Sequence, residues 1–460
     1  MARILETSDA ITFTVLVGHL EQAHGDARAN FETLKKLSKN GGCDLWVIDG
    51  YSEELSGLIR NAKFDLAIDA FFGTGLTRPL SSPFEDIMLD LIEADIPLIS
   101  VDMPSGLNAD SPELIGKQFS PSITVTFTSP KPATVLPPAA DICGELIVAG
   151  IGSPEELINE QPSQLYLAEK HDAAGWLGKS EFSNSSYKNK RGHALLIAGS
   201  RNYTGAAVLA ADAAIRSGVG LVTLAVPESS REAVVGRVMP EVMVRGITET
   251  EEGSASEKAV DEVKDFLKNV DAIAIGSGLS TNDETSAFVR RMVEERTMPM
   301  VIDADGLTAL SPFDMQGTDE LPLVLTPHEG EFMRLLGTED KDAIKDRVGA
   351  VRDFATKHHV ILVLKGERVL IGEPGGKVVV NPTGNSGLGK AGNGDTLSGI
   401  LIGFIAQAVQ MKIDVFETVL AACYISGMAG DVAEKKYGKR VMTASDVREC
   451  LVEVFEELGQ

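Results

Sequence analysis

The most informative stretch of the chain is NPTGNSGLGKAGNGDTLSG, residues 381–399. A glycine-dense loop leads directly into Asp395, and the apolar pattern of Asp395–Val409 predicts a helix. Gly392 and Gly394 have no side chains, so the backbone there can approach a ligand closely. The N–H groups at the start of a helix attract anions, and a carboxylate beside them can accept a proton. This combination suits phosphoryl transfer, whereas the alternative interpretation is a glycine-rich loop with Asp395 as a helix cap.

Short apolar runs and amphipathic stretches alternate along the rest of the 460 residues. This alternation predicts parallel sheets with helices on both faces, and the length suggests two or three domains. We expect the junction within Asn159–Ser186, which is polar and irregular apart from the helix-like Asp172–Leu177. The expected strands are Ile11–Val17, Leu45–Ile48, Phe64–Ile68, Ile96–Val101, Ile123–Phe127 and Leu146–Ala149, then Ala194–Ala198, Leu221–Val226, Ala272–Ile275, Met300–Ile302, Leu323–Leu325, Val360–Leu364 and Val378–Val380. The other expected helices are Gly25–Leu37, Phe84–Ala94, Gly205–Ser217, Val415–Ala433 and Ser445–Glu456.

The overall charge excludes some classes of partner. Lys and Arg total 42 against 67 Asp and Glu, a net charge of −25, which argues against nucleic acid and anionic membranes as partners. The four cysteines are far apart, so neither a zinc site nor a disulfide framework is indicated: Cys43, Cys143, Cys423 and Cys450. No signal peptide is visible, and the longest apolar stretch, near Gly399–Val409, is too short to span a bilayer. We therefore expect a cytoplasmic protein.

Five further motifs precede the glycine-rich loop in a fixed order. They are Gly192–Ser200 with Tyr203–Ala207, Ala274–Leu279 (AIGSGL), Asp303–Leu307 (DADGL), Leu325–Glu331 (LTPHEGE) and Leu364–Val369 (LKGERV). Together with the loop, they make residues 190–455 resemble the ADP- or ATP-dependent NAD(P)H-hydrate dehydratases, which are ribokinase-like enzymes. One departure is Ser277, which stands where that family usually has proline.

The resemblance implies a reaction and a set of site residues. The substrate would be NADH or NADPH hydrated on the nicotinamide ring; phosphorylation of the added hydroxyl and loss of phosphate would restore the ring. Asp395 would be the catalytic base. The substrate side would be lined by Ala206, Gly278, His328 and Asp395, and the nucleotide would be held by Lys365, Gly366, Glu367, Arg368, Val369 and Gly394. The sequence does not distinguish ADP from ATP, although the fused arrangement favours ADP.

Three residues keep two interpretations each. Asp303, with Asp305, either organises Mg²⁺ through water or caps a helix. His328 either faces the ligand or is an ordinary loop histidine with satisfied hydrogen bonds. Glu331 either caps the helix after Pro327, the favoured interpretation, or lies near the metal.

A second pair of motifs lies near the amino terminus. Asp65–Pro79 (DLAIDAFFGTGLTRP) is a strand running into a glycine turn, and Asp102–Gly106 (DMPSG) ends the next strand 33 residues after Asp69. Ordinary strand-end turns with capping aspartates would give the same pattern, but the motifs resemble the NAD(P)H-hydrate epimerase domain. That resemblance implies K⁺ binding by Asp69 and Ser105. It also implies substrate binding by Gly73, Thr74, Gly75, Leu76, Thr77, Arg78, Pro79 and Asp102, with Lys131 as a weaker candidate.

The epimerase resemblance is incomplete. The asparagine–glycine loop that normally follows that domain's first strand is not found; Met1–Leu5 aligns with the helix after it, and Gly41–Gly42 precedes a strand and is no substitute. Either the true start lies upstream or the domain is a remnant, and we expect weak or no epimerase activity from this chain. Residues 1–150 should also be less stable than residues 190–455, because loss of a central strand leaves backbone groups unpaired.

The expected architecture is α/β with two domains. An incomplete Rossmann-like three-layer domain (1–158) and a linker (159–189) precede a ribokinase-like three-layer α/β domain (190–460). A homo-oligomer acting on small molecules is expected. The alternative is a ribokinase-like vitamin-precursor kinase with a non-catalytic amino-terminal interaction domain, against which the TPHEGE and NPTGNSG segments argue.

Overall fold

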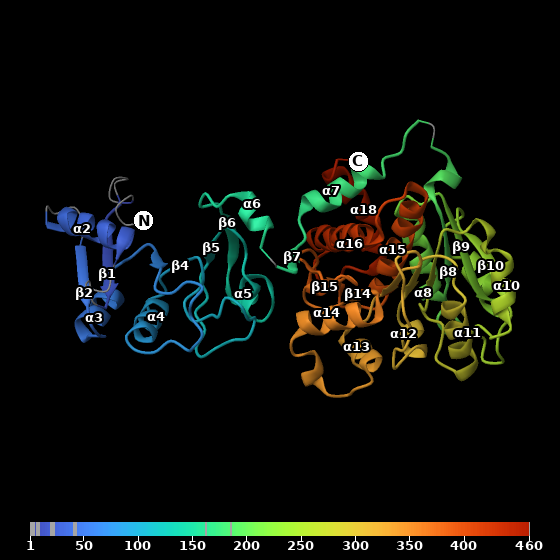
Figure 1. Ribbon diagram of the computed structural model, residues 1–460, viewed down its shortest axis with the longest axis horizontal. Coiled ribbons are helices and arrows are strands. Elements are labelled where there is room, and N and C mark those ends of the chain that lie inside the picture. The colour runs from blue at the N-terminus through green and yellow to red at the C-terminus, as the bar shows by residue number, and fades with distance from the viewer. Residues whose placement is uncertain are drawn as a thin grey trace. The chain divides into compact units, whose positions relative to one another are not determined.

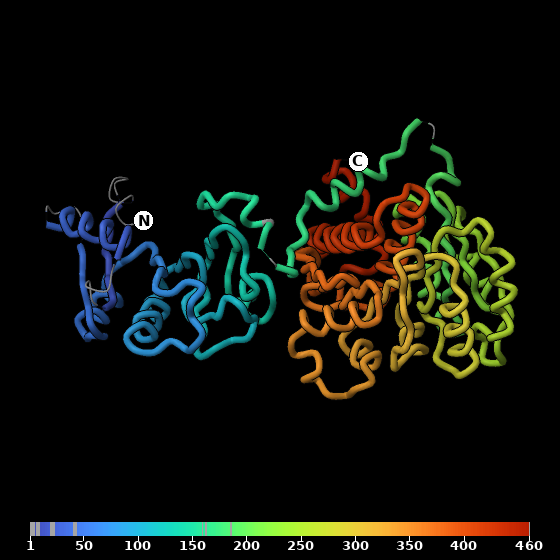
Figure 2. Tube along the Cα trace, viewed as in Figure 1, coloured from blue at the N-terminus to red at the C-terminus, as the bar shows by residue number. Residues whose placement is uncertain are grey.

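The computed structural model describes Leu5 and residues 10–18, 24–39, 44–161, 163–184 and 186–459. The chain divides into two units, Met1–Gln161 and Pro162–Gln460, each of which is described by itself (Figures 1 and 2). The helix expected from the alignment at the very start of the chain, the Gly41–Gly42 pair and Cys43 lie outside the described residues.

The first unit contains two separate parallel sheets. The first sheet pairs β1 (Phe13–Val17) with β2 (Asp44–Ile48). The second has the order β3 (Ala67–Asp69), β4 (Leu98–Val101), β5 (Ile123–Phe127) and β6 (Glu145–Ala149). The helices are α2 (Gly25–Lys39), α3 (Glu53–Asn61), α4 (Phe84–Glu93), α5 (Pro132–Val135) and α6 (Glu155–Asn159). No pairing between described strands joins the two sheets.

The second unit is built on one ten-stranded sheet. Its order is β10-β9-β8-β11-β12-β13-β14-β15-β16-β7. The strands are β7 (Leu165–Leu167), β8 (His193–Ile197), β9 (Leu221–Pro227), β10 (Met243–Ile247), β11 (Ala272–Ile275), β12 (Met300–Ile302), β13 (Leu323–Leu325), β14 (Ile361–Leu364), β15 (Val369–Gly372) and β16 (Val378–Asn381). All neighbours are parallel except β15, which runs antiparallel to both β14 and β16. This hairpin departs from the wholly parallel sheet that the alternation predicts.

Helices cover both faces of this sheet, as Figure 1 shows. One face carries α7 (Lys170–Lys179), α8 (Thr204–Arg216), α15 (Asn393–Met411), α16 (Val415–Tyr437), α17 (Ala444–Glu449) and α18 (Leu451–Glu457), which share one apolar core with the strands. The remaining helices are α9 (Arg231–Val235), α10 (Ala259–Asp265), α11 (Asp283–Glu294), α12 (Asp305–Ala309), α13 (Glu329–Leu336) and α14 (Arg347–His358). The last expected helix, Ser445–Glu456, is divided at Cys450 into α17 and α18.

Much of the segment expected to be a linker belongs to the second unit. Strand β7 pairs with β16 at the edge of the large sheet. In α7, the buried Trp176 ring stacks on Phe404 of α15 with centroids 4.2 Å apart. Its indole N–H also donates to Thr418 of α16 at 2.9 Å. Residues 163–184 therefore contribute a strand and a helix to this unit.

Helix α16 is long and apolar enough to cross a membrane by length and composition alone. It is longer than Gly399–Val409, the stretch that the sequence indicated as the longest apolar run. In the structure, 56% of its most apolar window is buried inside the protein, and it packs against α7, α15 and α18. Its apolar character is therefore that of a core helix in this fold.

The helix that follows the glycine-rich loop packs unusually close to α8. A Cβ atom on Gly399 would lie 2.1 Å from the carbonyl oxygen of Ala210, and one on Gly403 would lie 2.0 Å from the Ser217 hydroxyl. Only glycine permits that approach. These contacts fix the position of α15, and therefore of its first turn, against the sheet.

Candidate functional site

Polar residues follow four neighbouring parallel strands of the second unit. Ser277 comes after β11, Asp303 after β12, Thr326 after β13 and Lys365 after β14. Carboxyl ends of parallel strands meet at one edge of a sheet, where such folds bind ligands. The register therefore brings together motifs that are far apart in sequence.

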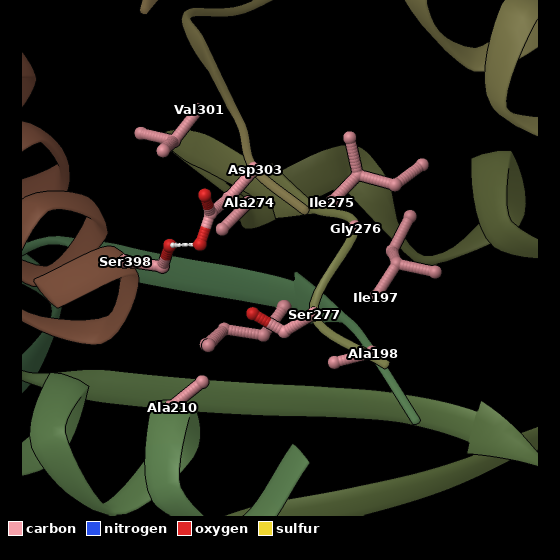
Figure 3. A pocket seen from close by; sticks show the side chains of 11 residues that line it. Ile197, Ala198, Ala210, Ala274, Ile275, Gly276, Ser277, Val301, Asp303 and Ser398 are labelled. Carbon is pink, nitrogen blue, oxygen red and sulfur yellow. Dashed lines mark hydrogen bonds between the residues drawn. The ribbon is translucent and has the colours of Figure 1, made fainter. Parts of the chain in front are cut away.

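Asp303 and Lys365 form the centre of this cluster. Lys365 Nζ donates to Asp303 Oδ1 at 2.7 Å, and the Thr326 hydroxyl donates to the same oxygen at 2.8 Å. The Ser398 hydroxyl, from α15, donates to Asp303 Oδ2 at 2.8 Å (Figure 3). Asp303 is only 2% exposed. The cluster thus ties the ends of three strands to α15.

The electrostatics keep this pair charged. Burial alone raises the pKa of the Asp303 carboxyl, but the charge and hydrogen bond of Lys365, with the two hydroxyls, hold it below its usual range. Burial lowers the pKa of Lys365, but the Asp303 and Glu331 carboxylates outweigh it and raise that pKa. The site therefore presents a fixed ammonium group near the start of α15.

Asp395 lies in the first turn of α15, beside backbone donors. The turn begins at Gly392, whose φ of +94° suits glycine. The N–H groups of Gly394 and Asp395 donate to no acceptor among the described residues. A Cβ on Gly394 would lie 3.6 Å from Lys365 Nζ and 3.7 Å from Asp303 Oδ2. Two free N–H groups, an ammonium and a carboxylate therefore surround one point, which suits an anion being transferred.

The pKa of Asp395 is raised to about 6, mainly by burial. The Ser277 hydroxyl and Lys365 oppose the rise, whereas the charges of Asp303 and Asp305 add to it. Ser277, which departs from the family's proline, is thus electrostatically coupled to the proposed base. A carboxylate with a pKa near neutrality is suited to general base catalysis.

The glycine-rich loop is held by its own polar residues. The Asn385 amide donates to Asp431 Oδ1 at 3.0 Å, and Gly384 N donates to Asp431 Oδ2 at 3.0 Å. Lys390 Nζ donates to the carbonyls of Arg440 and Met442 at 2.6 and 2.9 Å. Asp431 was not predicted as a site residue, because nothing near it in sequence marks it as the residue that holds this loop.

His328 and Glu331 form a capping box at the start of α13. His328 Nδ1 accepts from the N–H groups of Gly330 and Glu331 at 3.0 and 3.3 Å, so a neutral ring carries its proton on Nε2. Glu331 Oε2 accepts from His328 N at 2.9 Å. The capping interpretation of Glu331 is confirmed, and its Oε2 also lies 3.8 Å from Lys365 Nζ. The His328 side chain remains 56% exposed, so its ring is accessible to a ligand.

Ala206 and Gly278, two expected substrate residues, lie together. A Cβ on Gly278 would lie 2.9 Å from the Ala206 Cβ and 2.9 Å from the Tyr203 Cβ. The Ser200 hydroxyl donates to the Gly278 carbonyl at 2.9 Å. Ala206, in the first turn of α8, and the turn after β11 therefore share one wall.

The expected nucleotide residues form the turn between β14 and β15. Lys365 N donates to the Pro327 carbonyl at 2.8 Å, which joins this turn to the segment that precedes α13. Arg368 has a φ of +87°, and its Nη1 donates to the Pro382 carbonyl at 2.5 Å. The turn is thereby attached to the start of the glycine-rich loop, so the two expected nucleotide segments, Lys365–Val369 and Gly394, lie near each other.

Of the two expected roles of Asp303, only helix capping is tested, and the organisation of Mg²⁺ through water stays a prediction. Helix α12 begins at Asp305 with no side-chain cap, so the capping interpretation is wrong. Asp303 Oδ1 accepts two hydrogen bonds and Oδ2 accepts one, so about one lone-pair site of the carboxylate remains for a metal-bound water. Asp305 Oδ2 accepts from Ser280 N at 2.9 Å. No group of three or more metal-ligating side chains occurs in the described part of the chain.

The first unit gathers its expected residues at the ends of β3 and β4. Asp69, 2% exposed, accepts from the Ser105 hydroxyl at 2.5 Å, from Ser105 N at 2.8 Å and from the Ser100 hydroxyl at 3.0 Å. Asp102, at a φ of +67°, accepts from Lys131 Nζ at 2.6 Å. A Cβ on Gly73 would lie 3.3 Å from Asp102 Oδ2, which places the Gly73–Pro79 loop beside this pair.

K⁺ fits this arrangement only in part. Asp69 and Ser105 both offer oxygen, the ligand that a hard cation prefers. However, Asp69 Oδ1 accepts from the Ser105 hydroxyl and Phe71 N, and Oδ2 accepts from Ser105 N and the Ser100 hydroxyl. A carboxylate has about four lone-pair sites, so none is free for a cation in this geometry.

Comparisons with known proteins match both units. The family model described as NAD(P)H-hydrate dehydratase matches residues 194–452, and that described as YjeF-related protein N-terminus matches residues 1–133. The bifunctional NAD(P)H-hydrate repair enzyme Nnr of Moorella thermoacetica is 36% identical over 461 residues, covering 100% of this chain and 85% of the relative. The Nnr of Thermofilum pendens is 31% identical, with the same coverages of 100% and 85%.

Solved structures match the second unit. The ADP/ATP-dependent NAD(P)H-hydrate dehydratase from Bacillus subtilis, co-crystallised with ATP and Mg²⁺, matches with a TM-score of 0.55 and 28% identity. The match covers 64% of this chain and 98% of that one. A ribokinase-like superfamily protein from Enterococcus faecalis matches with a TM-score of 0.52 at 24% identity, which shows the fold alone.

Proposed function

The chain belongs to the family of bifunctional NAD(P)H-hydrate repair enzymes, and we propose that its second unit dehydrates hydrated NADH and NADPH at the site around Asp395. The observation that carries this assignment is the raised pKa of Asp395, about 6, beside two free backbone N–H groups and the Lys365 ammonium. The vitamin-precursor kinase alternative is not supported, because relatives that match the whole chain are hydrate repair enzymes.

The residues divide the reaction between them. Asp395 accepts the proton of the ring hydroxyl as that oxygen attacks the terminal phosphorus of the nucleotide. The Gly394 and Asp395 N–H groups stabilise the charge that builds on the transferred phosphoryl group. Loss of phosphate, together with a proton from the neighbouring ring carbon, then forms the double bond. With ADP as donor, hydrate and ADP give NAD(P)H, AMP and phosphate.

We propose positions for the two ligands that agree with the geometry of the site. The hydrated ring lies against Ala206, Gly278 and His328, and the nucleotide lies against the Lys365–Val369 turn with its phosphates at Gly394. Mg²⁺ would neutralise charge on the phosphates, and Asp303, with Asp305, would organise it through water. Given the fused arrangement, we propose ADP as the preferred donor.

The test is to incubate the chain with the S hydrate and either ADP or ATP and to follow the reappearance of reduced cofactor. Asp395→Asn should lower the rate by at least about 1,000-fold, since it removes the base while keeping the shape. Asp353→Asn, at an exposed position on α14, is the matched control and should keep the full rate. Full activity of Asp395→Asn would overturn the assignment of the base.

The first unit is proposed to interconvert the R and S hydrates. The Asp102–Lys131 pair beside the Gly73–Pro79 loop supports this role, because it sets a paired acid and base next to the expected substrate loop. The assay supplies pure R hydrate without nucleotide and follows formation of S. Robust conversion that Asp102→Asn abolishes supports the proposal and contradicts the weak activity expected from the sequence, whereas no conversion overturns the proposal.

We propose the cytoplasm as the compartment and a homo-oligomer as the assembly. Cys143, Cys423 and Cys450 are buried and unpaired, and burial raises the pKa of the first two thiols to about 12. Unreactive buried thiols agree with a reducing environment.

A further inference from the structure

Arg347 lies next to the turn that is expected to bind the nucleotide. It is the first residue of α14, and its side chain is only 21% exposed. A Cβ placed on Gly366 would lie 2.5 Å from Arg347 Nη2. The guanidinium therefore lies against the backbone of the β14–β15 turn, although the two residues are on different elements.

Most of the hydrogen-bonding capacity of this guanidinium is unused. Nε and Nη2 are buried and have no hydrogen-bond acceptor among the described residues. Nε lies 3.3 Å from Glu329 Oε1, but that ion pair lacks hydrogen-bond geometry. One N–H on Nε and two on Nη2 make three of the five guanidinium donors without an acceptor. Buried donors of this kind usually have partners, so their absence here points to a ligand.

A second arginine on the same helix shows the usual arrangement. Arg352 Nε donates to the Gly376 carbonyl at 2.9 Å. The two side chains belong to one helix and are both partly buried, yet only Arg347 is left with buried donors unpaired. The unpaired donors therefore result from the surroundings of Arg347 and are not a general property of arginines on this helix.

Two carboxylates, Glu329 and Glu367, lie near Arg347, but neither accepts a hydrogen bond from its buried nitrogens. A cation in the first turn of a helix meets the positive end of the helix dipole, which disfavours it unless an anion is close. Glu329 is 52% exposed and Glu367 is also exposed, so water screens both carboxylates. Gly366 has no side chain, which allows the guanidinium to lie directly against the backbone of the expected nucleotide turn.

We propose that Arg347 binds a phosphate group of the nucleotide, donating through Nη2 and Nε to its oxygens. This inference rests on the proposed nucleotide site at Lys365–Val369 and adds to it a residue from another element. A planar guanidinium donates two parallel hydrogen bonds to a phosphate, which matches the pair of unpaired nitrogen atoms.

The test compares binding of adenosine, AMP and ADP by calorimetry to the full chain and to three variants. Arg347→Gln should weaken binding of ADP about 10- to 100-fold, since hydrogen bonds to charged groups are lost, while adenosine binding stays within about twofold. Binding of AMP identifies the phosphate that Arg347 contacts. If Arg347→Gln weakens AMP binding as much as ADP binding, the contact is to the phosphate nearest the ribose. Arg352→Gln is the matched control and should leave the difference in binding affinity between adenosine and ADP unchanged.

A second variant guards against misfolding. Arg347→Lys keeps the charge and the aliphatic stem but not the planar pair of donors, so it should show an intermediate loss at an unchanged melting temperature. Wild-type affinity for ADP in both variants, or an equal loss for adenosine and ADP, would overturn the inference alone. Failure of the unaltered chain to bind ADP at all would overturn the proposed function and this inference with it.

Discussion

At the scale of single residues, the burial of Asp395 has opposite effects on catalysis and on folding stability. Its pKa of about 6 lies about two units above the ordinary value of 3.8, and burial is the main cause. At neutral pH the carboxylate is therefore mostly ionised and able to accept a proton. The same burial makes the ionised form costly for the folded state, at about 1.4 kcal/mol for each unit of pKa shift. Function and stability are thus opposed at this position.

Asp395→Asn should consequently stabilise the second unit while abolishing activity. A folded pKa above the unfolded value favours folding at low pH, and that advantage is lost as pH rises through the folded pKa. The free energy of unfolding of the variant should exceed that of the unaltered chain by up to about 3 kcal/mol at pH 8 and by about half of that at pH 5. Denaturant unfolding at the two pH values measures this. In the unaltered chain, kcat/KM should decrease as the pH falls below 6. An equal gain in the free energy of unfolding at both pH values would contradict the raised pKa of Asp395.

Site residues were predictable from the sequence only where residues adjacent in the chain act together. Gly394 and Asp395 are adjacent, and so are the residues of the Lys365–Val369 turn, so motifs identify them. Asp303 was correctly singled out, but its partners Lys365 and Ser398 lie 62 and 95 residues away. Only the strand register joins them, which is why its role as a buried anchor was not predicted.

At the scale of secondary structure, strand runs and helices were largely predictable, whereas strand direction was not. The apolar runs at β8, β9 and β11 to β14 lie where alternation places them, because buried parallel strands are continuously apolar. The antiparallel β15 was missed because a four-residue turn, Lys365–Arg368, leaves no room for a crossover helix. Helix α15 begins at Asn393, two residues before the expected start, since Gly392 can adopt a positive φ.

The contact between α8 and α15 gives a prediction at this scale. Gly399→Ala would place a Cβ 2.1 Å from the Ala210 carbonyl oxygen, so the helices must move apart. The change should cost about 1–3 kcal/mol and lower activity, because Asp395 lies one turn away on the displaced helix. Gly175→Ala on α7 is the matched control. Its Cβ would meet nothing within 4 Å, and it should stabilise by about 0.5–1 kcal/mol.

Thermal unfolding with parallel activity assays compares these two variants. A Gly399→Ala chain with unaltered melting temperature and rate would show that the close approach of the helices does not position the site.

At the scale of the whole molecule, the two units differ in how continuous their cores are. In the second unit, one large cluster of buried side chains joins one face of the sheet to α7, α8, α15 and α16. In the first, the buried residues form smaller clusters around two separate sheets. Several strand side chains there are exposed: Val47, Ile68, Ile147 and Val148. Less apolar area per residue is thus withdrawn from water in the first unit, and hydrophobic burial is the main stabilising contribution.

The first unit should therefore unfold before the second, and the chain contains a reporter for each. Its two tryptophans are Trp46, on β2 against Phe13, and Trp176, stacked on Phe404 in the second unit. On heating, fluorescence should show an early and a late transition separated by more than about 5 °C, with dehydratase activity lost only in the late one. In Trp46→Phe the early fluorescence transition should disappear and the late one remain at the same temperature. A single transition shared by both tryptophans and by activity would mean that the units unfold together, and the continuity of the core would then not set their relative stability.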